Sequence, residues 1–332
     1  MKKIFLMMLV LGATIYANNF DDGYYWQTIR KNDKKAIEFY TKAIAKGEDL
    51  QDSYYNRGVS YDNLGKYDLA IADYTKAINM NANDYQASNN RGLLYEKRKD
   101  YNRAISDYKN AINANPKYYN AYYNLGYVNN NLGNYDEALY NYKKALEIRP
   151  DDYQSYNNMG VSYENKGQFD EAVANYKKAI ELNNYYSLSY GNLSGIYIKQ
   201  KKYKEAIDIS KKAVILNPND HKSYSNMGLG YYYLGEYAES IINYEKAISL
   251  YSKNSSYFYN MGLSYDNLGD DKRAIQYYKE AIKVNSKNTD AYHNLGLIYI
   301  KQKRYNEAKV LAKTNCDLGD CELRDTIKKE GY

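Results

Sequence analysis

Residues Tyr119–Asp152 read YNAYYNLGYVNNNLGNYDEALYNYKKALEIRPDD, and this stretch decides the fold. The same skeleton returns before and after it at a constant spacing, so that Gly126 is matched by Gly92 and Gly160. Alanine and tyrosine positions recur with the same spacing. Self-similarity at a fixed period of this length is typical of repeat architectures. The chain is therefore predicted to grow in one dimension, repeat upon repeat, rather than around one or two compact cores.

Each repeat is predicted to contain two helices. Eight full repeats fill residues 51–315. In the first of them Gly58 falls in the first helical segment, while Ala70, Tyr74 and Ala77 fall on one face of the second because they are three and four residues apart. A turn of the N-L-G or K-x-K type separates the segments, and glycine there supplies a left-handed cap. All three prolines follow the second segment, where the ring blocks continuation of the helix.

This pattern of an aromatic residue, L-G, Tyr, Ala, a second aromatic residue, Ala and Pro resembles the tetratricopeptide repeat, a 34-residue helix–turn–helix unit. The resemblance covers roughly residues 34–315 and implies an all-α fold, a right-handed α-solenoid of stacked helix pairs. Some positions depart from the pattern. Ser194 replaces the glycine of the first helix, and Ser210 and Ala312 replace the aromatic residue of the second. These changes are expected to weaken single interfaces without breaking the register.

The two ends of the chain differ from the repeats. Residues 1–17 are predicted to be a signal peptide, since two lysines precede a short apolar run that ends near a small residue. Residues 18–50 are expected to form a degenerate N-terminal repeat, and residues 316–332 a C-terminal capping segment. The short signal indicates an exported tetratricopeptide repeat protein of bacterial type, either periplasmic or secreted.

The chain has only two cysteines, Cys316 and Cys321, in the sequence CDLGDC. Their spacing leaves room for a disulfide across a tight turn, which would agree with export to an oxidising compartment. Free thiols and a redox or metal-binding pair are the alternatives. No histidine is near them in the sequence and no second cysteine pair exists, so no metal site is predicted.

Charge and motif content argue against several function classes. The net charge is +6, but Lys and Arg alternate with Asp and Glu at helical spacing, so no basic stripe for nucleic acid is expected. The two histidines, His221 and His293, lie in different phases of the repeat. Metalloprotease, serine-hydrolase and phosphate-loop motifs are missing from the sequence. An enzyme is therefore not predicted, and no cofactor is.

The resemblance implies a concave groove lined by the first helix of each repeat. One asparagine column recurs there once per repeat, in all eight repeats: Asn56, Asn90, Asn124, Asn158, Asn192, Asn226, Asn260 and Asn294. Asparagine can donate and accept hydrogen bonds at once. The column could therefore hold an extended peptide backbone, or it could bridge adjacent repeats.

The same register places further side chains on the groove: Asn89, Tyr123, Tyr127, Asn130, Asn131, Asn157, Tyr232, Tyr233 and His293. Asn129 occupies a packed position where sister repeats carry tyrosine. It is either satisfied by neighbouring tyrosine hydroxyls or water, or retained for binding.

Two functions fit these features. The first is an interaction scaffold that binds a protein or an extended peptide in its groove, with envelope components as further candidate partners. The alternative is a module that binds glycans or cell-wall material through groove tyrosines. The sequence does not define the oligomeric state.

Overall fold

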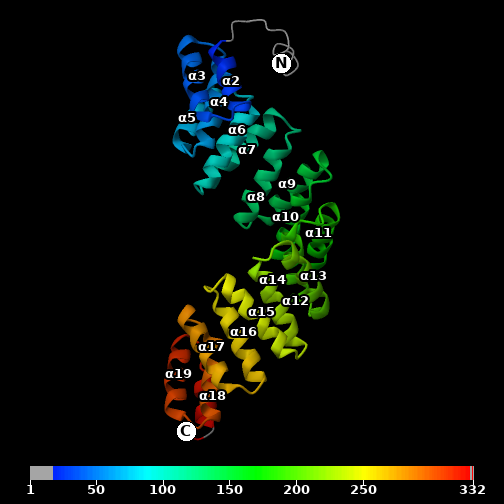
Figure 1. Ribbon diagram of the computed structural model, residues 1–332, viewed down its shortest axis with the longest axis vertical. Helices are drawn as coiled ribbons and strands as arrows, with labels where there is room; N and C mark the ends of the chain where they lie inside the picture. Colours follow the sequence, from blue (N-terminus) through cyan, green and yellow to red (C-terminus); the bar gives the residue numbers. More distant parts are fainter. Residues whose placement is uncertain (1–17, 330, 332) are drawn as a thin grey trace. The chain divides into compact units, whose positions relative to one another are not determined.

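All secondary structure in the described part of the chain, residues 18–329 and 331, is helical (Figure 1). The structure is a computed structural model. The predicted signal peptide, residues 1–17, lies outside these residues. None of the described helices combines the length and the apolar character needed to cross a bilayer.

The chain forms two bodies, which we call the N-terminal body (residues 18–151) and the C-terminal body (from residue 152 onward). The helices of the N-terminal body are α2 (Asn19–Thr28), α3 (Asp33–Lys46), α4 (Leu50–Asn63), α5 (Tyr67–Met80), α6 (Tyr85–Lys97), α7 (Tyr101–Ala114), α8 (Tyr119–Asn131) and α9 (Tyr135–Ile148). Those of the C-terminal body are α10 (Tyr153–Asn165), α11 (Phe169–Leu182), α12 (Ser187–Lys199), α13 (Tyr203–Leu216), α14 (His221–Tyr233), α15 (Tyr237–Leu250), α16 (Ser255–Asn267), α17 (Asp271–Val284), α18 (Thr289–Lys301), α19 (Tyr305–Asp317) and α20 (Glu322–Lys329). Each body is a solenoid of stacked helix pairs, and in each repeat we call the first helix A and the second helix B.

A tyrosine of helix B packs into a glycine notch of helix A in the same repeat. In the fourth full repeat the Tyr176 ring is fully buried, and a Cβ atom built on Gly160 would lie only 2.5 Å from it. The glycines of five other full repeats face a helix-B tyrosine in the same way. Each of these rings therefore fills the space between the two helices of its own repeat.

The degenerate N-terminal repeat keeps this contact although its first half does not match the pattern. Helix α2 brings Gly23 against the ring of Tyr40 on α3, where an added Cβ would lie 2.7 Å from the ring. The Tyr40 hydroxyl also donates to the side-chain oxygen of Gln27 at 2.8 Å. A helix pair therefore opens the array, with its apolar contact intact.

Two repeats of the N-terminal body add a buried ion pair between helices A and B. Arg57 donates two hydrogen bonds to the Asp73 carboxylate, at 2.7 and 2.8 Å, and Arg91 does the same to Asp107. All four side chains are largely withdrawn from solvent. Removal of one partner would leave an uncompensated buried charge, so these pairs fix the helix angle firmly.

The fifth full repeat, which contains α12 and α13, carries small residues at both positions of the notch contact. Ser194 and Ser210, which replace the notch glycine and the tyrosine, are both fully buried. In this repeat, which lacks the ring, α12 contacts α14 as well as α13. Ile207 of α13 also packs against α14, since an added Cβ on Gly230 would lie 2.8 Å from it. Close contacts between helices therefore take the place of the tyrosine ring in this repeat.

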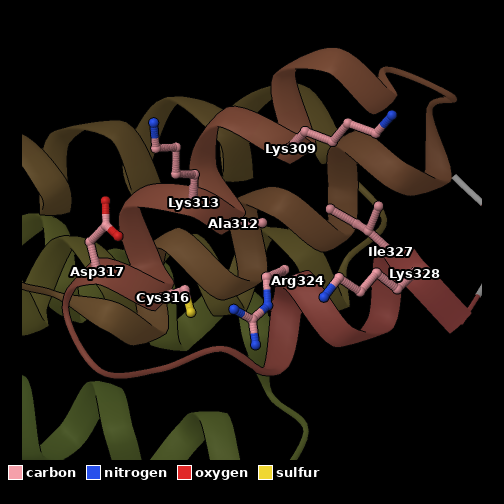
Figure 2. A pocket seen from close by; sticks show the side chains of 8 residues that line it. All are labelled: Lys309, Ala312, Lys313, Cys316, Asp317, Arg324, Ile327 and Lys328. Carbon is pink, nitrogen blue, oxygen red and sulfur yellow. The ribbon is translucent and has the colours of Figure 1, made fainter.

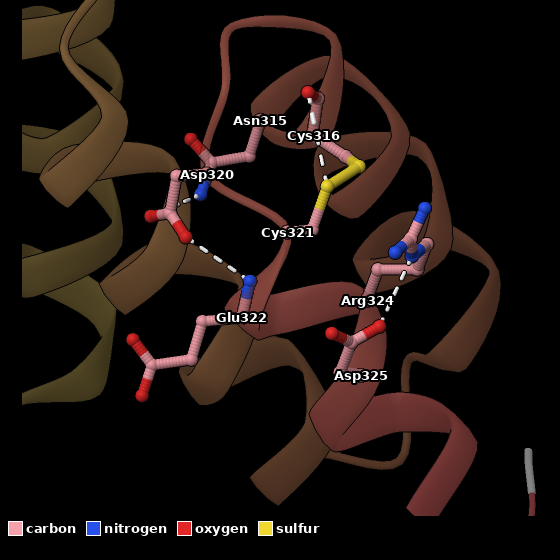
Figure 3. The surroundings of a disulfide bond; sticks show 7 residues. All are labelled: Asn315, Cys316, Asp320, Cys321, Glu322, Arg324 and Asp325. Atoms are coloured by element: carbon pink, nitrogen blue, oxygen red, sulfur yellow. Dashed lines mark hydrogen bonds and ion pairs between the residues drawn. A yellow bond between two sulfur atoms is a disulfide. The ribbon is translucent and has the colours of Figure 1, made fainter.

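The last full repeat lacks a ring because Ala312 takes its place, and α20 supplies the missing contact. Leu323 of α20 is fully buried, and an added Cβ on Gly296 would lie 2.3 Å from its side chain. A disulfide joins Cys316 in α19 to Cys321 just before α20 (Figure 3). The cross-link therefore lies two residues from the leucine that closes the final notch.

Candidate partner-binding face

The asparagine column lies on helix A in every full repeat, and all eight members are half-buried. A residue that is neither in the core nor fully in solvent can contact both a neighbouring repeat and a ligand. We call the column, together with Tyr127, Asn131 and Tyr233, the helix-A face, and consider it separately in the two bodies.

The side-chain amides of the column bridge adjacent repeats. In the N-terminal body Asn90 donates to the Tyr55 hydroxyl at 3.3 Å, and Asn124 donates to the side-chain oxygen of Asn89 at 3.0 Å. Asn56, in the first full repeat, instead donates to the Asp52 carbonyl of its own helix. The side-chain amides of Asn90 and Asn124 therefore bridge adjacent repeats, which was one of the two predicted roles of the column.

The same bridge recurs in the C-terminal body with different acceptors. Asn192 donates to the Asn157 side-chain oxygen at 3.1 Å, Asn226 to the Ser194 hydroxyl at 2.7 Å, and Asn294 to the Tyr259 hydroxyl at 3.1 Å. The acceptor varies, while the donor and its register stay constant. An asparagine tolerates this variety because its amide needs only an oxygen within reach.

The side-chain oxygens of the column behave differently from the amides. The oxygen of Asn90 accepts from the side-chain amide of Asn89 at 3.3 Å. Within residues 18–329 and 331, six members accept no hydrogen bond at this oxygen: Asn56, Asn124, Asn192, Asn226, Asn260 and Asn294. The helix-A face therefore carries half-buried carbonyl oxygens that can accept from a ligand.

Two asparagines that were predicted on the groove are in fact buried. Asn89 and Asn157 are only 2% and 4% exposed and serve as acceptors for the next repeat of the column. The prediction was wrong for both, because a position beside the column turns toward the neighbouring helix when its side chain is short enough to bridge. They belong to the support of the face and not to its surface.

The unit that begins at Tyr119 contributes both core and surface. The Tyr123 ring packs on the ring of buried Tyr142, with centroids 6.0 Å apart, so much of it belongs to the core. Tyr127, one turn further along α8, is 41% exposed, and Asn131 is exposed as well. Asn130 is half-buried. Tyr127 is therefore the groove tyrosine of this repeat that offers the most surface to a partner.

Asn129 is buried, and its hydrogen bonds are made inside its own repeat. Its amide donates to the Leu125 carbonyl at 2.8 Å, and its oxygen accepts from the Asn134 side chain at 3.3 Å. The two predicted alternatives were hydrogen bonds to tyrosine hydroxyls or water, and retention for binding. The main chain and a neighbouring asparagine serve instead, since a short side chain on a helix reaches the carbonyl four residues back.

Among the A helices of the C-terminal body, α14 carries the exposed aromatic side chain. Tyr233 is 55% exposed and stacks on Tyr203 of α13, with ring centroids 4.7 Å apart. Tyr232 is half-buried, its hydroxyl accepts from Asn267 at 3.2 Å, and burial raises the pKa of that hydroxyl. The pair of stacked rings gives this body a flat apolar surface with little conformational freedom to lose on binding.

Two cations beside the helix-A face have carboxylate partners. Lys97 lies 3.6 Å from Asp62, and Lys199 lies 2.7 Å from Glu164, both across adjacent A helices. Such exposed pairs contribute little to stability, but they reduce the net field that a charged partner would meet. Burial raises the pKa of Glu96 even though Tyr108 donates to its carboxylate at 2.7 Å.

A separate recess lies between α19 and α20, where Ala312 replaces the ring (Figure 2). Its volume is about 330 Å³, with Ala312 and Ile327 among the lining residues. Its rim carries four basic side chains and Asp317, and the basic ones are exposed: Lys309, Lys313, Arg324 and Lys328. Exposed lysines of this kind are well solvated.

Sequence models described as tetratricopeptide repeat match residues 52–84, 84–214 in three overlapping segments, and 221–254, and one described as TPR repeat matches 267–303. Together these matches span more than half of the chain. The chain belongs to the tetratricopeptide repeat family. In general terms this family provides scaffolds for protein interaction that are usually not catalytic. No curated protein matches the chain.

Solved tetratricopeptide repeat structures show the same fold. A chain of the APC/C hetero-tetramer Cut9–Hcn1 is 14% identical, with a TM-score of 0.59; the alignment covers 100% of this chain and 67% of that one. The C-terminal part of a TPR repeat-containing protein from Cytophaga hutchinsonii is 21% identical, with coverages of 72% and 99% and a TM-score of 0.57. The pilF protein of Pseudomonas aeruginosa is also 21% identical, with coverages of 64% and 97% and a TM-score of 0.57.

Proposed function

We propose that the protein is a scaffold that holds an extended segment of a partner protein against its helix-A face. The observation that carries the proposal is the asparagine column, whose amides are used between repeats while the oxygens of Asn124, Asn192, Asn226 and Asn294 accept no hydrogen bond within the described residues. An extended backbone offers N–H groups at regular spacing, whatever its side chains are. Within the C-terminal body, the oxygens of Asn192, Asn226 and Asn294 therefore suit recognition of a peptide chain by its backbone.

Exposed tyrosines beside the column would add affinity. Tyr127 and Tyr233 each present a large exposed ring, and the Tyr233 ring is already stacked on Tyr203. Aromatic side chains of this kind provide much contact area at a small entropic cost. Ion pairing of Lys97 and Lys199 leaves these cations poorly placed to bind phosphates, which favours a protein over a nucleic acid.

The proposal includes export, with the partner in the cell envelope or outside it. The disulfide between Cys316 and Cys321 supports this, because such bonds persist in oxidising compartments. A short N-terminal segment with the composition of a signal peptide supports it as well.

The test uses selection of random peptides on the full chain, followed by affinity measurements on Tyr127→Ala and Tyr233→Ala. The matched control is Tyr140→Ala, because Tyr140 is 60% exposed but lies on helix B of the repeat that contains Tyr127. We expect loss of affinity for at least one helix-A variant and none for the control. Equal affinities for all three variants would contradict the proposal.

The glycan alternative is separated by the same variants. It rests on the stacked rings of Tyr203 and Tyr233, which offer a flat surface of the kind on which a sugar ring can stack. Purified wall material is incubated with the wild type and with Tyr233→Ala. Binding that needs Tyr233, together with no selected peptide, would support the glycan function in place of the peptide function.

A further inference from the structure

Three potential metal ligands that are distant in sequence meet beside α20. They are His293 on α18, Asp320 in the loop that follows α19, and Glu322 at the start of α20. One ligand atom from each residue lies within 4.8 Å of the other two. Nothing in the sequence predicts this meeting, since the whole of α19 separates the histidine from both carboxylates along the chain.

The loop that carries the two carboxylates is held in place. The disulfide joins Cys316 to Cys321, which lies between Asp320 and Glu322 in the sequence (Figure 3). Asp320 accepts from the Asn315 side chain at 3.0 Å and from the Glu322 backbone N–H at 3.0 Å. In Figure 3 the side chains of Asp320 and Glu322 project to the same side of the loop, away from the two sulfur atoms. Hydrogen bonds that orient a ligating carboxylate are a usual feature of metal sites.

The third ligand is an imidazole with an unused nitrogen. His293 Nδ1 is buried and has no hydrogen-bond partner. The other histidine of the chain differs, because His221 Nδ1 lies 2.8 Å from the Tyr257 hydroxyl and its ring stacks on Tyr251. A buried ring nitrogen without a hydrogen-bond partner is costly unless a ligand supplies one. This observation is independent of the two carboxylates and is what separates the cluster from an ordinary acidic surface.

We propose that His293, Asp320 and Glu322 bind a divalent transition-metal ion, with zinc as the best match. Imidazole and carboxylate ligands suit zinc, whereas calcium and magnesium are bound through oxygen alone in most proteins. Three protein ligands leave a fourth tetrahedral position for water or for a group of a partner.

The geometry needs only a small closure to bind the ion. Zinc bonds of about 2.0–2.2 Å in a tetrahedral site place the ligand atoms roughly 3.4 Å from one another. The present limit of 4.8 Å is larger, but Glu322 is exposed and can rotate toward the other two. The ion would tie α18 to the loop before α20, as a second cross-link beside the disulfide.

The test is calorimetric titration of Zn²⁺ into the oxidised, tag-free full chain, with Mg²⁺ and Ca²⁺ as comparison ions. We expect one Zn²⁺ per chain, and a melting temperature of the α18–α20 region that rises with Zn²⁺ because the ion binds the folded state. Loss of a ligand should weaken binding by at least about tenfold, since even residues behind the ligands have effects of that size. His293→Gln should therefore lose Zn²⁺, and His221→Gln, the matched control, should keep it.

Glu322→Gln protects the test against a folding artefact. The residue is exposed, so the variant should fold like the wild type by circular dichroism and still bind Zn²⁺ at least about tenfold more weakly. No binding to the wild type would overturn the proposal. Equal binding by the wild type, His293→Gln and Glu322→Gln would show an adventitious ion only. Binding of Mg²⁺ or Ca²⁺ as tight as that of Zn²⁺ would overturn the assignment to a transition metal.

Discussion

Gly160→Ala tests the packing that sets the helix pair. A Cβ atom at this position would lie 2.5 Å from Cε1 of Tyr176, 2.7 Å from Cδ1 and 3.0 Å from Cζ. Ordinary contact begins near 3.4 Å, so the fully buried ring would have to retreat substantially. Overpacking of a core costs about 1–3 kcal/mol, and this case lies near the upper end. Alanine regains about 1 kcal/mol of helix propensity, which leaves a net loss of about 2 kcal/mol.

The chain provides a matched control in the same body. Gly195 lies on α12, where an added Cβ would meet only the Asn226 amide, at 3.8 Å. Gly195→Ala should therefore gain about 1 kcal/mol from helix propensity with no steric cost. Urea unfolding gives both free energies, and hydrogen exchange shows whether the loss is centred on α10 and α11, as expected in an array whose repeats contact only their neighbours.

The two variants are expected to move in opposite directions, with a difference of about 3 kcal/mol between them. If Gly160→Ala were as stable as the wild type, the ring would have room to move and the notch would not be a tight contact. If both variants lost stability equally, helix-A glycines would be needed for some reason other than the tyrosine ring. Either result would refute the packing account given above.

Three further predictions concern buried groups. Arg91→Ala should cost about 3–5 kcal/mol in urea unfolding because it strands the Asp107 carboxylate, and Arg91→Met combined with Asp107→Leu should recover most of the loss. Leu323→Ala should cost about 2–5 kcal/mol, seen as faster hydrogen exchange in α18–α20 with α10–α12 unchanged; unchanged exchange in α18–α20 would contradict the assigned role. Alkaline pH should destabilise the N-terminal body: burial raises the pKa of Tyr55 to about 12, against about 10 when unfolded, so the folded state keeps a proton that the unfolded state loses. Stability should therefore fall as pH rises from about 10 to about 12, as followed by circular dichroism, and a flat profile would exclude this linkage.

The fold could be predicted from the sequence because its deciding contacts are local. Gly160 and Tyr176 lie on the two helices of one repeat, and their spacing recurs often enough to fix both helices and their register. The family matches and the helical structure confirm the tetratricopeptide repeat prediction. The helices of residues 18–50 were less evident, since Gly23 keeps its contact with Tyr40 while the residues around it depart from the pattern.

What could not be predicted depends on contacts outside the period. Leu323 fills the notch of Gly296 from a helix that has no counterpart in other repeats. A signal was present in the sequence: Gly296 is retained although Ala312 has replaced the ring that would need it. The approach of His293 to Asp320 follows from the same helix and could be found only once α20 was placed.

The asparagine column shows a second limit. The position of the column in each repeat was evident from the sequence. The acceptor of each side-chain amide was not, because it depends on which side chain the preceding repeat places within reach. That neighbour is Tyr55 in one case, Asn89 in another and Ser194 in a third. The groove residues themselves remain predictions, with Tyr127 and Tyr233 as the most accessible tyrosines among them.

The contact of each tyrosine with the glycine of its own repeat has a consequence for how the number of repeats can change in evolution. A recombination that removes or duplicates one whole repeat in frame leaves every remaining ring with its own glycine, because the pair travels together. Only the junction between repeats has to be remade, and the amide of the column asparagine can donate there to either a hydroxyl or an amide oxygen. A gene for such a chain can change its length in single steps, and each product inherits helix pairs that already fit.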